Sequence, residues 1–274
     1  DIQRDIQSLG YDEDDYMLSG INAVASPITF LYQQLSRKEQ SKRVVAQLEN
    51  DDRRRDLLKE LFRIYVDYKI IDLTNEEFDD FITKCYESID TIRKAADTIG
   101  VLIGSPARNP GKKGKDLFNA AFFLYEQKIV AEIHKTLLPT YDVFDENRYF
   151  EAASSWQVIP FKGKKLAVTI CEDIWNLGDN PLYTICPMDE LMKQSPDIML
   201  NLSASPFDYT HDEDRKATIK ANVLKYKIPL FYCNAVGSQT EIVFDGGSYA
   251  FDKDANLCGA LPMFRSELSF YTCN

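Results

Sequence analysis

The sequence lacks the cysteine and histidine spacings that bind structural zinc. Its six cysteines form no C-x-x-C pair, and its only histidines are His134 and His211. The sequence therefore predicts no metal site. Without paired cysteine motifs, reduced thiols are the simpler interpretation, and reduced thiols are typical of the cytoplasm.

Long apolar runs and excess basic charge are also missing. No run approaches the roughly 18 apolar residues of a membrane-spanning helix, and the N-terminal residues lack the basic and apolar regions of a signal peptide. The 32 Lys and Arg residues stand against 43 Asp and Glu, a net charge of −11. The acidic balance disfavours nucleic-acid partners, and the missing apolar run disfavours a membrane, so small molecules or proteins are the favoured partners. The chain begins at Asp1 rather than at a methionine, which is typical of a fragment or a processed product.

The composition that is present is globular, and its N-terminal part is helical in pattern. Apolar residues make up 45% and charged residues 27% of the 274 residues, which excludes disordered, collagen-like and coiled-coil chains. Helices are predicted at 36–49, 57–65 and 74–100 from capping boxes and apolar stripes. The stretch 62–70 fits a helix or a strand. We therefore expect residues 1–71 to form a mostly helical segment, whose role is unassigned.

From residue 101 onward, short apolar runs are separated by Gly, Pro and Asn, a pattern typical of strands and loops. Helices are expected between these runs at 187–194 and 214–226. The expected strands are 101–103, 118–125, 129–133, 166–170, 198–202, 230–233 and 248–251. Alternating helices and apolar strands predict an α/β or α+β layered domain over residues 72–274.

Two glycine-containing segments do not fit a phosphate-binding loop. Ser105–Lys115 lacks the G-x-x-x-x-G-K-[ST] pattern, and we predict a linker between two strands. Asp245-Gly-Gly-Ser248 is predicted to be a turn between strands, because Gly supplies positive φ and no helical pattern follows.

The most informative segment is an apolar strand that ends at a cysteine. Residues 164–175 read KKLAVTICEDIW, which places Cys171 at the end of the strand and two carboxylates directly after it. Strand ends in layered α/β folds display reactive groups, and a thiol there is a nucleophile if a neighbour activates it. A lone strand cysteine is more often a buried structural residue. The neighbouring motifs decide between these two roles of Cys171.

Three further motifs accompany this cysteine. One of them contains Lys135 at a strand end, and such a lysine would by itself be interpreted as a solvated cation. In chain order the four are IHKTLLPTYDVFDENRYF (133–150), CEDIW (171–175), NLSASPF (201–207) and FDGGS (244–248). Together they resemble the nitrilase, or carbon–nitrogen hydrolase, superfamily, and more narrowly the glutaminase domains of glutamine-dependent NAD synthetases. The resemblance covers about residues 72–274.

The resemblance implies a four-layer αββα sandwich and a Glu-Lys-Cys triad. Cys171 would attack the side-chain amide of glutamine, form a thioester and release ammonia, and water would then release glutamate. Lys135 would stabilise the oxyanion together with a backbone N–H next to Cys171. This step needs no cofactor. The implied glutamine pocket is lined by Tyr141, Glu172, Trp175, Ser205 and His211.

His211 departs from the family pattern, because the family commonly has a stronger cation there for the substrate carboxylate. Arg215 and Lys216 lie nearby in the sequence. Aromatic residues such as Tyr141 and Trp175 also fit a plain core or surface role.

The family's catalytic glutamate is not found at its usual place, after a buried strand and a proline near the N-terminus. None of the eleven prolines is adjacent to a glutamate. Glu60 is the candidate by position, but its neighbours predict an amphipathic helix that would hold it in water. Either the segment 1–71 replaces the family's first strands, or those strands lie outside this chain, or the site has lost catalysis.

The ATP- and Mg-dependent synthetase domain of the full-length enzymes is expected outside this chain, because no Ser-Gly-Gly-x-Asp-Ser loop occurs. Three hypotheses follow. The first is a glutaminase that supplies ammonia to a synthetase domain or partner for amidation of deamido-NAD. The second is a stand-alone hydrolase of another small amide, and the third is a catalytically silent interaction module. A homo-oligomer is expected by resemblance alone.

Overall fold

The structure, a computed structural model, covers most of the chain beyond the N-terminal segment. It describes residues 75–111, 113–141, 144–239 and 242–272. The predictions for residues 1–71, including the helices at 36–49 and 57–65 and the candidate base Glu60, lie outside the described residues. None of the described helices is long and apolar enough to cross a membrane.

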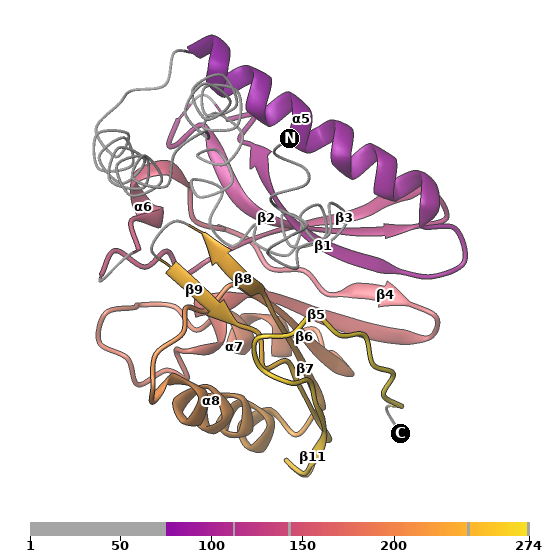
Figure 1. The fold of residues 1–274 in the computed structure, drawn as a ribbon, viewed down its shortest axis with the longest axis vertical. Coiled ribbons are helices and arrows are strands. Elements are labelled where there is room, and N and C mark those ends of the chain that lie inside the picture. The colour runs from indigo at the N-terminus through magenta and orange to yellow at the C-terminus, as the bar shows by residue number, and fades with distance from the viewer. Residues whose placement is uncertain (1–74, 112, 142–143, 240–241, 273–274) are drawn as a thin grey trace, which may run out of the picture.

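A three-stranded antiparallel sheet and one long helix form the first two layers (Figure 1). The sheet has the order β1 (Val101–Arg108), β2 (Leu117–Tyr125), β3 (Lys128–His134). Helix α5 (Asn75–Ala95) covers its outer face. The buried side chains of α5 recur at helical spacing, and the resulting apolar stripe, which includes Ile89, packs against the sheet.

A six-stranded sheet and two helices form the other two layers. The strands, in chain order, are β4 (Ile159–Phe161), β5 (Lys164–Ile170), β6 (Ile198–Ser203), β7 (Leu230–Asn234), β10 (Tyr249–Phe251) and β11 (Leu257–Ala260). Their order in the sheet is β11-β10-β7-β6-β5-β4, and β5, β6 and β7 are parallel. Helices α7 (Pro187–Met192) and α8 (His211–Tyr226) pack on this sheet. The carboxyl ends of β5, β6 and β7 therefore meet at one edge.

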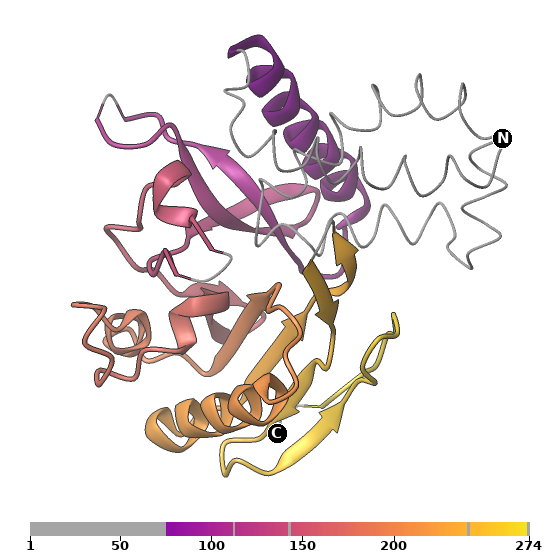
Figure 2. The same ribbon diagram turned by 60° about the vertical axis from the view of Figure 1, so that its left-hand side comes forward.

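The two sheets pack face to face, and their contact is apolar. Ala121 and Phe123 of β2 lie against Leu166, Val168 and Ile170 of β5 in one buried cluster. The order of layers is thus helix, sheet, sheet, helix, and Figure 2 shows α5 and α8 on opposite sides of the two sheets. The predicted αββα sandwich is confirmed.

All seven predicted strands are present, but the end of β1 was predicted wrongly. The segment from Ser105 to Arg108 continues β1 instead of beginning a linker. Pro106 suggested a break, yet in the described sheet β1 pairs only with β2, and a proline is tolerated on such an edge strand. Four short strands were not predicted: β4, β11, β8 (Val236–Gln239) and β9 (Ile242–Asp245).

The Asp245–Ser248 segment is a turn between β9 and β10, as predicted. Gly246 and Gly247 have φ values of 69° and 65°, in the region that favours glycine. The turn lies beside the carboxyl end of β7, where it contacts Asn234.

Candidate active site

Cys171 lies where β5 ends and a 3-10 turn (Cys171–Ile174) begins. Its side chain is buried, and its φ of 45° lies in the left-handed region that residues other than glycine rarely adopt. Backbone strain of this kind is concentrated at functional sites. The strained turn brings the cysteine to the edge at which β5, β6 and β7 end.

Lys135 follows the last residue of β3 and is fully buried, unlike a solvated cation. Its Nζ donates a 2.6 Å hydrogen bond to the Oε1 of Glu146, and Glu146 is the first residue of α6 (Glu146–Tyr149). Asn119 Nδ2 of β2 donates to the other oxygen of Glu146 at 3.0 Å. A buried charge needs a partner, and Glu146 provides one to Lys135.

The charges at this site oppose the effects of burial. Burial raises the pKa of the Cys171 thiol, while the positive charge of Lys135 lowers it in part. Burial alone would lower the pKa of Lys135, but the charges of Glu146 and Cys171 outweigh it, and the pKa of Lys135 is raised. The lysine is therefore cationic at neutral pH, and the thiol needs a base to become a nucleophile.

Asp173 connects the turn that carries the cysteine to the segment that carries the lysine. Its Oδ1 accepts hydrogen bonds from the backbone N–H groups of Thr136 and Leu137, at 3.0 and 2.8 Å. Its Oδ2 accepts one from the N–H of Ile170, at 3.0 Å. One buried carboxylate thus fixes the residues after Lys135 relative to the residue before Cys171.

We expect the stability of the Asp173→Asn variant, relative to wild type, to be greater at pH 7 than at pH 5. Burial, partly offset by the hydrogen bond from Leu137, raises the pKa of Asp173 from 3.8 to about 6. The stability that this carboxyl contributes is thus complete below pH 3.8 and is lost as the pH rises through 6. Asparagine does not titrate. The free energy of unfolding of the variant, relative to wild type, should rise by about 1 kcal/mol between pH 5 and pH 7.

Urea unfolding of both proteins at the two pH values measures this change. Asp197→Asn is a matched control, because that carboxylate also accepts a backbone hydrogen bond, from Lys165, but does so at the exposed end of a strand. A variant-minus-wild-type difference that is the same at both pH values would contradict the prediction.

Two tyrosines from different loops converge on Glu172, the carboxylate directly after Cys171. The hydroxyl groups of Tyr141 and Tyr183 each donate a 2.8 Å hydrogen bond to Glu172 Oε1. Glu172 is only 6% exposed, and in the described part of the chain no Lys, Arg or His forms an ion pair with it. The buried carboxylate therefore has donors but no cation.

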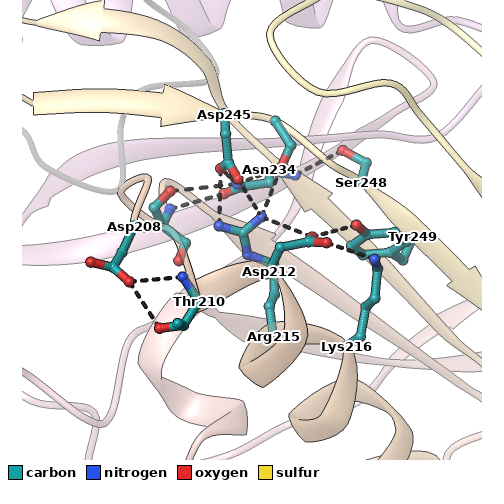
Figure 3. Close-up of polar contacts among 11 residues, drawn as sticks. Asp208, Thr210, Asp212, Arg215, Lys216, Asn234, Asp245, Ser248 and Tyr249 are labelled. Atoms are coloured by element: carbon teal, nitrogen blue, oxygen red, sulfur yellow. Dashed lines mark hydrogen bonds and ion pairs between the residues drawn. The ribbon is translucent and has the colours of Figure 1, made fainter.

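Ser205 is held by a buried network that reaches the glycine turn. Figure 3 shows the part of this network around Arg215, Asn234 and Asp245. Its backbone N–H donates to Asn234 Oδ1 at 2.9 Å, and Asn234 Nδ2 donates to the carbonyl of Gly246 at 2.7 Å. Arg215, in α8, forms a bidentate pair with Asp245 at 2.9 and 3.1 Å. This network fixes the loop after β6 relative to the turn before β10.

His211 and Trp175 lie side by side, with ring centroids 5.2 Å apart. Burial and the nearby charge of Arg215 lower the pKa of His211, so its imidazole is mostly neutral at pH 7. Arg215 is committed to Asp245, and Lys216 forms an ion pair with Asp212 at 2.6 Å. Neither therefore replaces His211 as a free cation.

The predicted residues thus fall into connected groups around the carboxyl edge of the sheet. Cys171 interacts electrostatically with Lys135, and Tyr141 contacts Glu172. Within the described ranges, no three or more His, Cys, Asp or Glu side chains are placed to bind a metal ion.

Sequence reasoning missed two residues. Glu146 stands inside the motif 133–150, directly after a second carboxylate, Asp145, and no sequence pattern distinguishes the two. Tyr183 lies in a loop without a regular pattern, so no periodicity pointed to it. The pairing of Lys135 with Glu146 and of Tyr183 with Glu172 is visible only in three dimensions.

Comparison with known proteins gives one family and a consistent set of relatives. A profile of the family described as carbon-nitrogen hydrolase matches residues 81–274. A glutamine-dependent NAD(+) synthetase of Synechocystis is 34% identical over 196 residues, which are 69% of this chain and 35% of that protein. The corresponding enzyme of Thermotoga maritima is 34% identical over 154 residues, 56% of this chain and 26% of its own length. The chain thus spans about a third or less of these relatives.

Solved structures show the same fold. A glutamine-dependent NAD+ synthetase of Acinetobacter baumannii, solved with adenosine diphosphate, superposes with a TM-score of 0.58 and 25% identity. The match covers 70% of this chain and 33% of that one. A carbon-nitrogen hydrolase of Helicobacter pylori superposes with a TM-score of 0.56 at 16% identity, covering 70% of this chain and 68% of that one. The second likeness concerns the fold alone.

Proposed function

The chain belongs to the carbon–nitrogen hydrolase family, and we propose that its site hydrolyses the side-chain amide of glutamine and releases ammonia. The observation that carries this proposal is the fully buried Lys135, which pairs with Glu146. The positive charge of Lys135 lowers the pKa of Cys171 in part. An ion pair kept beside a buried thiol is costly for the fold and is suited to a reaction that develops negative charge. The names of the relatives support glutamine as the substrate.

In the proposed reaction, the sulfur of Cys171 attacks the carboxamide carbon, and the carbonyl oxygen becomes an oxyanion. The ammonium group of Lys135 stabilises this oxyanion. When the tetrahedral adduct collapses, the C–N bond breaks, the nitrogen takes up the proton that the Cys171 thiol released and leaves as ammonia, and a thioester remains on Cys171. Water then attacks the thioester carbon, the C–S bond breaks, and glutamate leaves with the thiol restored.

The contacts of Glu172, the residue after Cys171, suit the binding of an amino acid. Glu172 is a buried carboxylate that accepts two phenolic hydrogen bonds, and an α-ammonium group of the substrate would supply the cation it lacks. We place Tyr141, Trp175 and Ser205 in the same pocket, and His211 at the substrate carboxylate. The neutral state of His211 makes it a hydrogen-bond donor there rather than a full charge.

The ammonia would serve a synthetase domain or partner that amidates deamido-NAD, in keeping with the names of the longer relatives. ATP and Mg would belong to that acceptor, and the amide step itself would use no cofactor. We also propose a cytoplasmic location, supported by five free cysteines in the described ranges. A homo-oligomer is proposed from the family resemblance alone.

A second candidate function is hydrolysis of another small amide. The observation that favours it is the lowered pKa of His211 together with the commitment of Arg215 to Asp245, which leaves carboxylate recognition without a full positive charge. A simple amide lacks an α-carboxylate and would not need that charge.

Ammonia release from a panel of amides tests both proposals. Glutamine, asparagine and acetamide are compared by kcat/KM, with a Cys171→Ala preparation as the blank. The glutaminase proposal predicts the highest kcat/KM for glutamine. A higher value for acetamide would replace it with the second candidate, and a panel at the level of the blank would leave the silent interaction module.

A further inference from the structure

Tyr183 lies on a loop that folds back over the residue after the nucleophile. The loop joins the 3-10 turn at Cys171 to helix α7, and Tyr183 is half-buried within it. Its hydroxyl shares Glu172 Oε1 with Tyr141, each at 2.8 Å. Burial and the charge of Glu172 raise the pKa of both phenols, so both remain protonated donors at neutral pH.

The loop that carries Tyr183 is braced by a buried asparagine. Asn176 Nδ2 donates to the carbonyl of Ile185 at 2.7 Å, and its Oδ1 accepts from the N–H of Gly178 at 2.9 Å. Lys225 of α8 also donates to the carbonyl of Leu177 at 2.8 Å. These contacts hold both ends of the loop, so the hydroxyl of Tyr183 reaches Glu172 without a large loss of loop entropy.

Two donors on one oxygen restrict a carboxylate more than one donor does. A single hydrogen bond lets the group rotate about the bond, whereas donors from two separate loops fix its plane. Among the described residues none donates a hydrogen bond to the Oε2 of Glu172, and that oxygen is not among the fully buried atoms without a partner. The second oxygen is therefore available to a ligand.

We propose that Tyr183 is a positioning residue that determines specificity: with Tyr141, it holds Glu172 so that the carboxylate binds the α-ammonium group of an amino-acid amide. This inference rests on the proposed glutaminase function. Tyr183 acts through Glu172 and does not take part in the bond-making steps. Its removal should therefore affect substrates that carry an ammonium group and leave the reactivity of Cys171 itself unchanged.

The test compares two electrophiles that alkylate Cys171 in the full chain. One is a diazoketone analogue of L-glutamine, which carries the α-ammonium group, and the other is iodoacetamide, which is neutral. Second-order rate constants are measured by mass spectrometry of the Cys171 peptide for wild type, Tyr183→Phe and Tyr141→Phe. Leu182→Ala is the matched control, because Leu182 is a 71% exposed neighbour in the same loop.

Tyr183→Phe should slow alkylation by the glutamine analogue about 10-fold, the effect of losing one hydrogen bond to a charged group. Alkylation by iodoacetamide should stay within about twofold of wild type, and Leu182→Ala should change neither rate. Tyr141→Phe should act like Tyr183→Phe. The double variant should lose less than the product of the two single effects, because the loss of either donor already leaves the carboxylate free to rotate.

The inference is overturned if Tyr183→Phe leaves the rate with the glutamine analogue unchanged, or lowers both rates equally. Equal loss would mean that the tyrosine only supports the thiol or the loop. Failure of the proposed function gives a different result. In that case both the wild-type protein and the Tyr183→Phe variant would react with the glutamine analogue no faster than free cysteine does.

Discussion

Lys135→Met should lower kcat/KM for amide hydrolysis by about 1,000-fold, the scale expected when a preorganised group at an oxyanion is removed. Lys135 is fully buried, and no other described lysine or arginine lies within ion-pair distance of Glu146. No other cation of the described chain therefore takes its place. Its loss also removes the charge that lowers the pKa of Cys171, so the thiolate becomes rarer. Methionine has a similar length, which limits the cavity that the substitution creates. Steady-state ammonia release measures the effect.

Two comparisons separate chemistry from folding in this experiment. Glu146→Gln keeps an acceptor for Lys135 but removes the partner charge, so it should cost less activity than Lys135→Met. Lys164→Met changes an exposed lysine at the start of β5 and should leave kcat/KM unchanged. Lys135→Met also leaves Glu146 as an unpaired buried carboxylate, which costs about 3 kcal/mol or more. Activity is therefore normalised to the folded fraction. A kcat near the wild-type value would contradict the proposed role of Lys135.

The layered fold was predictable because each layer repeats a simple pattern. The strands β5, β6 and β7 are parallel and central, so they form continuous apolar runs that stand out between polar loops. Helix α5 has an apolar stripe of helical period. Strands of three or four residues, such as β4 and β11, hold too few residues for a period to be visible.

The site was only partly predictable, because its residues are joined by contacts across the chain. Cys171 and Lys135 follow strands, so their positions followed from the pattern. The partner of Lys135 is eleven residues away in a short helix, and no sequence pattern distinguishes Glu146 from the carboxylate beside it, Asp145. Tyr183 reaches Glu172 through a loop whose path depends on the side chain of Asn176.

Arg215→Met should lower the free energy of unfolding by about 3 to 5 kcal/mol, because it leaves Asp245 as a buried charge without its partner. Both side chains are fully buried, and Arg215 binds both oxygens of Asp245 and also the carbonyl of Gly246. Burial alone would lower the pKa of Arg215, but the groups around it, Tyr232 and Asp245, raise it, so it stays charged. Urea unfolding measures the loss.

The next residue of α8 provides the matched control for this buried pair. Lys216 forms an ion pair with Asp212 at 2.6 Å, but its side chain is 40% exposed, so Lys216→Met should cost less than about 1 kcal/mol. The double variant Arg215→Met with Asp245→Leu removes both charges and should recover much of the stability lost by Arg215→Met. If the double variant is no more stable than the single one, the loss comes from packing rather than from an unpaired charge.

Arg215→Met should also impair the site, because the Arg215–Asp245 pair and Ser205 meet in one network. Asn234 accepts the N–H of Ser205 at 2.9 Å and donates to Gly246, whose carbonyl also accepts from Arg215. In the double variant, stability returns but the carbonyl of Gly246 still lacks its arginine donor. We therefore expect that variant to fold and to keep a raised KM for glutamine, while kcat stays close to the wild-type value. A double variant with wild-type KM would show that the network supports only the fold.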